Sequence, residues 1–209
     1  MYPLRIPRHA CSPRDRARAG DLWRLLQEAA ILHSCEVGWP PTRYREVGSG
    51  FVVREITGVH LREAAYGEDL VGWSRVVDSR RDLLMRRSTG IEGVLLGSAE
   101  WVHLGADGAP GRAPRALVDA FPVSPPEPPV ELPEWEEHAP DPILPFELIP
   151  WWTEMDPMGH VNHPRYVDWA DEALSAWLAS RGDDPLGLIP RAERVRFRAA
   201  AKEIGRAHV

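Results

Sequence analysis

The most informative stretch of the sequence is TEMDPMGHVNHPRYVDWADEA, residues 153–173. It holds an acid, a glycine, a histidine and an amide within seven residues: Asp156, Gly159, His160 and Asn162. Pro164 suits the first position of a helix, where a missing N–H removes no helical hydrogen bond. The stretch therefore predicts a turn that leads directly into the N-terminus of a helix over about residues 164–179.

The residue types in this turn are those that acyl-transfer chemistry uses. The N–H of Gly159 or His160, beside the positive end of a helix, can hold the oxyanion that develops on a carbonyl. Asp156 can activate a water as general base or attack the carbonyl directly, and the sequence leaves both open. His160 can orient or polarise the reacting groups. Asn162 can hold the carboxylate or the water, unless it caps the helix.

A structural interpretation stands beside this catalytic one. Asp-Pro is a common start of a turn, and Gly159 is a common type of turn glycine. Tyr166 and Trp169 lie three residues apart, so both can pack on one face of the helix.

The composition excludes several classes of protein. The chain has 209 residues, 44% of them hydrophobic, which suits one large domain or two small ones. A net charge of −6 argues against nucleic acid as a partner. The two cysteines, Cys11 and Cys35, make neither a disulfide framework nor a metal-binding pattern, so a cytoplasmic setting is expected. The N-terminus lacks a signal-peptide pattern, and no apolar run reaches the roughly 20 residues of a membrane span.

Residues 1–122 read as one unit. A short strand over residues 4–7 precedes a helix over 20–35, whose apolar residues recur at helical spacing. Four β-type segments follow, over residues 50–61, 70–78, 83–90 and 94–104. This order predicts an α+β domain in which the helix lies on one face of an antiparallel sheet.

The pattern changes after residue 122 and then restarts. Residues 123–145 are rich in proline, which predicts an extended, semi-rigid linker. A strand over 146–152, the turn and helix described above, and a strand over 194–200 then repeat the opening order of the first unit. The first copy has no histidine or asparagine at the corresponding turn, so it is expected to be chemically blank.

The last seven residues, EIGRAHV at 203–209, look like the translation of a sequencing adapter. We therefore expect a chain truncated near Lys202, with a partial second unit over 146–202 and a non-native tail over 203–209.

The pattern D-x-x-G-H-V-N-x-x-x-Y-x-x-W at residues 156–169 resembles the signature of hotdog-fold thioesterases. These include the 4-hydroxybenzoyl-CoA thioesterase-like proteins and the acyl-ACP thioesterases. Residues 22–30 resemble the first hotdog helix of the acyl-ACP thioesterases, and residues 99–104 and 110–114 resemble the last strand of that hotdog and its exit. The resemblance implies an α+β chain of two tandem hotdog domains, the second incomplete, each a long helix wrapped by a curved antiparallel β-sheet.

The resemblance also implies a function. It implies a thioester hydrolase of fatty acid biosynthesis that releases a fatty acid from an acyl carrier protein (ACP) or from acyl-CoA, and it allows a homodimer. No metal and no bound cofactor are needed. The implied catalytic residues are Asp156, His160 and Asn162, and the implied substrate-binding residues are Gly159, Tyr166 and Trp169. The chain departs from the acyl-ACP thioesterases at Met158 and Ala200, where asparagine and glutamate are usual.

Two other functions remain open. A hotdog enzyme of another reaction, a dehydratase or hydratase of acyl thioesters, would act at the carbons beside the carbonyl. A non-catalytic acyl-binding module is favoured by the blank first copy and by Ala200. An acidic protein that binds an acidic carrier needs a local basic patch, for which the candidates are Arg14, Arg16 and Arg18, or Arg80, Arg81, Arg86 and Arg87.

Overall fold

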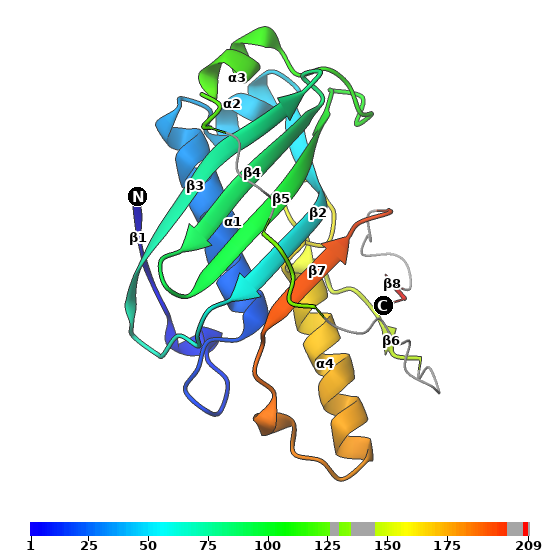
Figure 1. The fold of residues 1–209 in the computed structure, drawn as a ribbon. Helices are drawn as coiled ribbons and strands as arrows, with labels where there is room; N and C mark the ends of the chain where they lie inside the picture. The colour runs from blue at the N-terminus through cyan, green and yellow to red at the C-terminus, as the bar shows by residue number, and fades with distance from the viewer. Residues whose placement is uncertain (126–129, 135–144, 200–206, 209) are drawn as a thin grey trace.

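A long helix packed against one antiparallel sheet forms the body of the computed structural model, which describes residues 1–125, 130–134, 145–199 and 207–208 (Figure 1). The helix is α1 (Ala19–Glu36). The sheet has the strand order β1-β3-β4-β5-β2-β7. Its strands are β1 (Tyr2–Arg5), β2 (Gly50–His60), β3 (Asp69–Arg80), β4 (Leu84–Ile91), β5 (Leu95–Leu104) and β7 (Ala192–Arg196).

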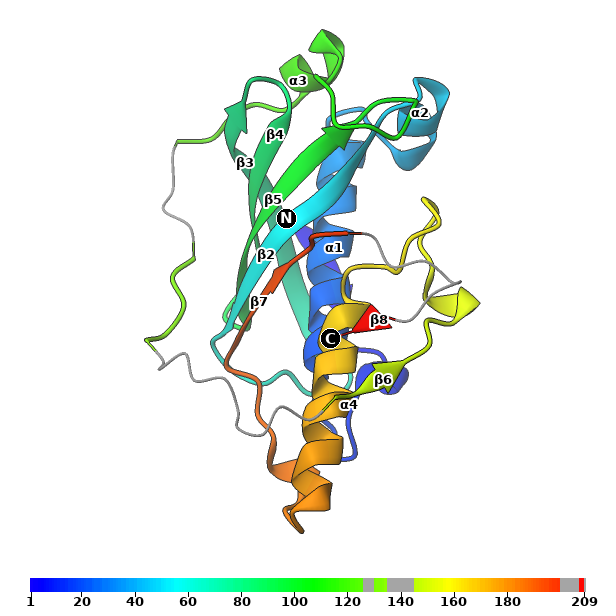
Figure 2. The same cartoon turned by 90° about the vertical axis from the view of Figure 1, so that its right-hand side faces the viewer.

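Shorter elements surround this body. Two short helices, α2 (Pro41–Glu46) and α3 (Arg115–Ala120), lie at one end of the sheet, and α4 (Arg165–Ser180) lies beside α1 (Figures 1 and 2). Three 3-10 turns and a two-strand pair complete the described chain: η1 (Arg8–Ala10), η2 (Trp152–Glu154), η3 (Pro185–Gly187), and β6 (Glu147–Leu148) with β8 (Ala207–His208).

The core lies between α1 and the sheet. Leu22, Leu26 and Ala29 recur along one face of α1 and are buried, as the helical spacing predicted. Leu22 and Leu26 pack in one cluster with buried sheet residues that include Ile56 and Leu95. The expected helix and the four expected strands of residues 50–104 are confirmed to within about two residues at each end. The α+β class and the antiparallel sheet are likewise confirmed.

The strand of the second unit joins the sheet of the first. β7 pairs antiparallel with β2, so that Val195 lies opposite Ile56 and Glu193 lies opposite Gly58. The sequence predicted this strand over residues 194–200, but it spans Ala192–Arg196, because its extent follows its pairing with β2 rather than its own apolar pattern. Ala200 lies outside the described residues.

The segment before the turn also differs from the prediction. The strand expected over residues 146–152 is limited to Glu147 and Leu148. The 3-10 turn η2 replaces its end, because the Glu154 side chain accepts a hydrogen bond from the N–H of Trp151 and draws the chain into a turn. Residues 126–129 and 135–144 of the expected linker, and residues 203–206 and 209 of the expected tail, lie outside the described part of the chain.

α1 and α4 approach each other closely at their N-terminal turns (Figure 2). A Cβ built on Gly20 would lie 1.9 Å from Oδ1 of Asp168 and 3.3 Å from the carbonyl oxygen of Pro164. Arg24, one turn further along α1, reaches Asp168 with both guanidinium Nη atoms. Glycine at position 20 therefore lets the two helices come close enough for this ion pair to form. In the described residues, no helix is long and apolar enough to cross a membrane.

The contact at Gly20 predicts a stability change. Gly20→Ala should lower the free energy of unfolding by about 1–3 kcal/mol, because the new methyl group overlaps Asp168. Helix propensity alone would raise it by about 1 kcal/mol. Urea denaturation followed by circular dichroism measures the change. Gly187→Ala is the control, since its Cβ meets nothing within 4 Å. An equal or higher urea midpoint for Gly20→Ala would contradict the predicted overlap.

Candidate active site

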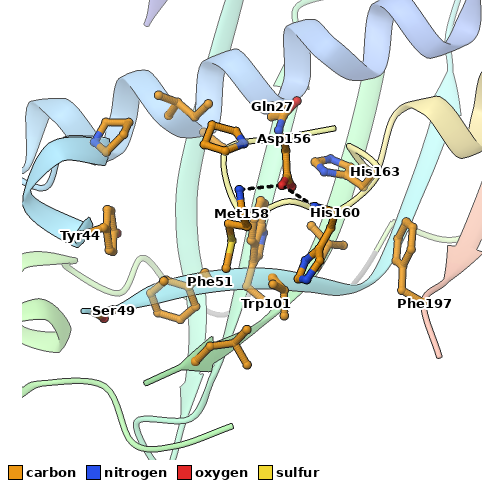
Figure 3. A pocket seen from close by; sticks show the side chains of 18 of the residues that line it. Gln27, Tyr44, Ser49, Phe51, Trp101, Asp156, Met158, His160, His163 and Phe197 are labelled. Carbon is orange, nitrogen blue, oxygen red and sulfur yellow. Dashed lines mark hydrogen bonds between the residues drawn. The ribbon is translucent and has the colours of Figure 1, made fainter. Parts of the chain in front are cut away.

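Asp156 organises the turn that precedes α4. Its N–H donates to the carbonyl of His160 at 2.7 Å, and its own carbonyl accepts from the N–H of Gly159 at 3.0 Å. Its carboxylate atom Oδ1 accepts from the N–H of Met158 at 2.8 Å and from that of His160 at 3.2 Å. Gly159 takes a φ of 73°, which glycine adopts without strain. The turn is thus closed around one carboxylate (Figure 3).

This geometry determines which groups stay available. The N–H groups of Gly159 and His160, which the sequence suggested as oxyanion donors, are occupied by Asp156. In the described residues, the backbone N–H groups of Val161 and His163 have no hydrogen-bond acceptor, and both residues lie on a cavity wall. Oδ2 of Asp156 likewise has no hydrogen-bond partner there.

Glu154 anchors the turn to α4. Its side chain is 7% exposed and forms an ion pair with Arg165 at 2.9 Å. It also accepts from the N–H of Trp151 at 2.9 Å and from Nε1 of Trp169 at 3.4 Å. A buried carboxylate is stable only when its oxygens are satisfied in this way. Glu154 therefore fixes both the entry of the turn and the first two helical turns of α4.

Asn162 connects the turn to the first unit. Its side chain exchanges two hydrogen bonds with Gln27 of α1, at 3.0 and 3.1 Å. Its backbone N–H donates to the carbonyl of Glu154 at 2.9 Å, and its carbonyl accepts from the N–H of Arg165 at 2.9 Å.

The turn lies on the wall of a cavity of about 690 Å³ that extends into the first unit (Figure 3). One stripe of α1 forms another wall, with residues three and four apart: Gln27, Ala30, Ile31 and Ser34. Aromatic side chains contribute much of the remainder: Trp39, Tyr44, Phe51, Trp101, Tyr166 and Phe197. Asp156 and His160 thus border a mainly apolar space.

The cavity wall includes a buried cation, Arg87 of β4. It donates to the carbonyl of Ala30 at 2.7 Å and to Oγ of Ser34 at 3.0 Å, and lies over the ring of Phe121. Burial lowers the pKa of its guanidinium to about 10. Arg87 cannot belong to the surface patch suggested by the sequence, because it is buried under α1.

The structure brings together only part of the predicted site. Asp156, His160 and Tyr166 line the same cavity. Gly159 lies at the exposed tip of the turn, and Asn162 faces α1 instead. Trp169 is 5% exposed and packs against Glu154 rather than lining the cavity.

The sequence analysis missed His163 and the contribution of the first unit. His163 lies on the cavity wall between the rings of Trp101 and Phe197, with ring centroids 6.0 and 6.4 Å away. Burial lowers its pKa to about 4, so its imidazole is neutral near pH 7. One signal in the sequence could have indicated a cavity wall on α1. It is the helical spacing of four lining residues, Gln27, Ala30, Ile31 and Ser34.

No group of three or more metal-ligating side chains occurs in the described residues. The cavity wall beside the turn presents a carboxylate, two imidazoles and backbone N–H groups.

The burial of His163 predicts a pH dependence of stability. The folded protein binds this proton with a pKa of about 4 and the unfolded chain with one of about 6.5. Between these values the unfolded chain binds more protons, so stability falls as pH falls, by up to about 1.4 kcal/mol per pH unit. His163→Phe should reduce this slope, whereas His9→Phe, at an exposed histidine, should not. Urea denaturation at pH 4–7 measures the slope, and equal slopes in wild type and His163→Phe would contradict the prediction.

Comparisons with known proteins agree with this fold. Residues 150–209 match the family model of the thioesterase-like superfamily. No curated protein sequence matches the chain. Three solved structures share its fold over almost its whole length. A provisionally assigned oleoyl thioesterase from Lactobacillus plantarum matches with a TM-score of 0.79 and 20% identity, over 96% of this chain and 78% of its own.

The other two are acyl-ACP thioesterases. The enzyme from Bacteroides thetaiotaomicron matches with a TM-score of 0.74 and 17% identity, over 96% of this chain and 81% of its own. The 12:0-ACP thioesterase from Umbellularia californica matches with a TM-score of 0.75 and 16% identity, over 98% of this chain and 84% of its own. This chain therefore has the hotdog fold of the acyl-ACP thioesterases, and its residues 150–209 match the thioesterase-like superfamily.

Proposed function

We propose that this protein is a thioester hydrolase that releases a fatty acid from acyl-ACP or acyl-CoA. The observation that carries the proposal is the position of Asp156 and His160 at the wall of a mainly apolar cavity, beside the N-terminus of α4. The match of residues 150–209 to the thioesterase-like superfamily supports it. The division into units over 1–122 and 146–202, joined by a linker, is part of the same proposal, as is a cytoplasmic setting.

The acyl chain would occupy the cavity of the first unit. The aromatic side chains of Trp39, Tyr44 and Phe51 offer an apolar lining for it. Apolar surface that leaves water gains roughly 25 cal/mol per Å². Burial of the acyl chain in the cavity would therefore place the thioester carbon beside the turn that holds Asp156.

Asp156 would act on the hydrolytic water. Its atom Oδ1 is occupied by two backbone N–H groups, which keeps the carboxylate oriented. Oδ2 is left to accept a proton from water as the water oxygen bonds to the carbonyl carbon and the C–S bond breaks. The products are a carboxylic acid and a thiol. Direct attack by Oδ2 would give an anhydride that water then hydrolyses.

Two other groups would assist the reaction. The ring of His160 extends from the turn into the cavity on the side of Trp101 and can donate a proton to the departing sulfur (Figure 3). The N–H groups of Val161 and His163 are the candidates for holding the oxyanion, since they lie on the wall and have no acceptor in the described chain. They replace the N–H groups of Gly159 and His160 that the sequence suggested.

The role of Asp156 can be tested by substitution. Asp156→Asn should lower kcat/KM for acyl thioesters by roughly 10²–10⁴-fold, because the amide cannot take the proton of water. Hydrolysis is followed by a thiol reagent, with acyl-ACP and acyl-CoA compared as substrates. Glu46→Gln is the control, since Glu46 is an exposed residue of α2.

Three outcomes would reject the proposal in different ways. Unchanged turnover in Asp156→Asn would remove the role of that residue. Hydration or dehydration of an enoyl thioester without release of thiol would favour the dehydratase. Tight acyl binding without any turnover would favour a non-catalytic module.

The position of the acyl chain makes a second prediction. Ile31 of α1 lines the cavity. Ile31→Trp should fill the space and shift the preferred substrate to shorter acyl chains, whereas Ile31→Ala should shift it to longer ones. The measurement is kcat/KM over a series of saturated acyl thioesters. A preferred length that is the same in both variants would place the chain elsewhere.

A further inference from the structure

The contact between Gln27 and Asn162 joins two parts of the chain that are 135 positions apart. Nε2 of Gln27 donates to Oδ1 of Asn162 at 3.0 Å, and Nδ2 of Asn162 donates to Oε1 of Gln27 at 3.1 Å. We infer that this reciprocal amide pair positions the Asp156 turn, so that Gln27 of the first unit is a positioning residue for the active site of the second. This inference rests on the proposed function.

The reciprocal pattern makes the contact directional. Each amide gives one donor and one acceptor, so turning over either amide alone would bring oxygen against oxygen and nitrogen against nitrogen. The pair therefore holds both side chains in one orientation. Because both residues are partly buried, an amide that lost its partner would be left poorly solvated.

Asn162 transmits this restraint to the turn through its backbone. Its N–H donates to the carbonyl of Glu154, and its carbonyl accepts from the N–H of Arg165. Asp156 and His160 lie in the segment between Glu154 and Asn162, which is closed by an antiparallel bridge between Met155 and Val161. Both ends of that segment are thus connected to the one residue that Gln27 holds.

Gln27 is well placed for this role on α1. It belongs to the stripe of α1 that lines the cavity, and Figure 3 shows it reaching toward the turn. Arg24 lies on the same face one turn earlier, where it binds Asp168 of α4. The two contacts have different targets. Arg24 contacts α4 itself, and Gln27 contacts the turn that precedes α4. The first unit, expected to be chemically blank, therefore contributes to the geometry of the active site.

The first test replaces Gln27 by a side chain of similar length that cannot form the pair. Gln27→Met should lower kcat by about 10–100-fold, since a displacement of about 1 Å at a reacting group can have an effect of this size. KM should change by less than about threefold, because the apolar walls of the cavity are kept. Glu28→Met is the matched control, an exposed neighbour on the same helix.

The second test is rescue by exchange. Gln27→Asn and Asn162→Gln should each lower kcat, because one pair is too short and the other too long. The double variant Gln27→Asn/Asn162→Gln restores the combined length and should recover at least about tenfold over either single variant. A purely structural role would lower the folded fraction, measured by circular dichroism, without this pattern in kcat.

The third test does not depend on activity. Hydrogen exchange of the N–H groups at residues 156–160 should be faster in Gln27→Met than in Glu28→Met, because the turn is released. If wild type hydrolyses no acyl thioester, the proposed function fails, and this exchange experiment still decides whether the pair holds the turn. Two results would overturn the inference: folded Gln27→Met with kcat within about twofold of wild type, or equal exchange in the two methionine variants.

Discussion

Arg24 and Asp168 meet where α1 passes the first turn of α4, and the packing of these two helices depends on this contact. It is possible only because residue 20 is glycine, since any Cβ there would overlap the Asp168 carboxylate. A charge pair that is partly removed from water interacts more strongly than one on the surface. The contact fixes the start of α4, and with it the direction from which the preceding turn enters the cavity.

The turn itself is organised by carboxylates that serve two different purposes. Glu154 is buried and fully engaged with Arg165 and its neighbours, so it acts as an anchor. Only one carboxylate oxygen of Asp156, Oδ1, accepts hydrogen bonds from backbone N–H groups, and Oδ2 stays available. Environment rather than residue type thus leaves Glu154 fully engaged and Asp156 with one oxygen available, although the two are only two positions apart.

The cavity combines an apolar lining with a few polar groups held in fixed states. Burial keeps His163 neutral near pH 7, and it lowers the pKa of Arg87 without removing its charge at that pH. Arg87 is satisfied by a helix carbonyl and a hydroxyl group rather than by an acid. Such groups contribute hydrogen bonding and shape to the wall while most of its surface remains apolar.

The helix and strands of residues 19–104 and the turn before α4 could be predicted from the sequence, because local periodicity and turn residues specify these elements. The sequence also placed Asp156 and His160 close together, since they lie within one short motif. Only the tertiary structure decided that β7 extends the first sheet, that Asn162 faces Gln27, and that His163 and α1 line the cavity. Those contacts join residues that are far apart in the chain. A local sequence pattern does not specify such contacts.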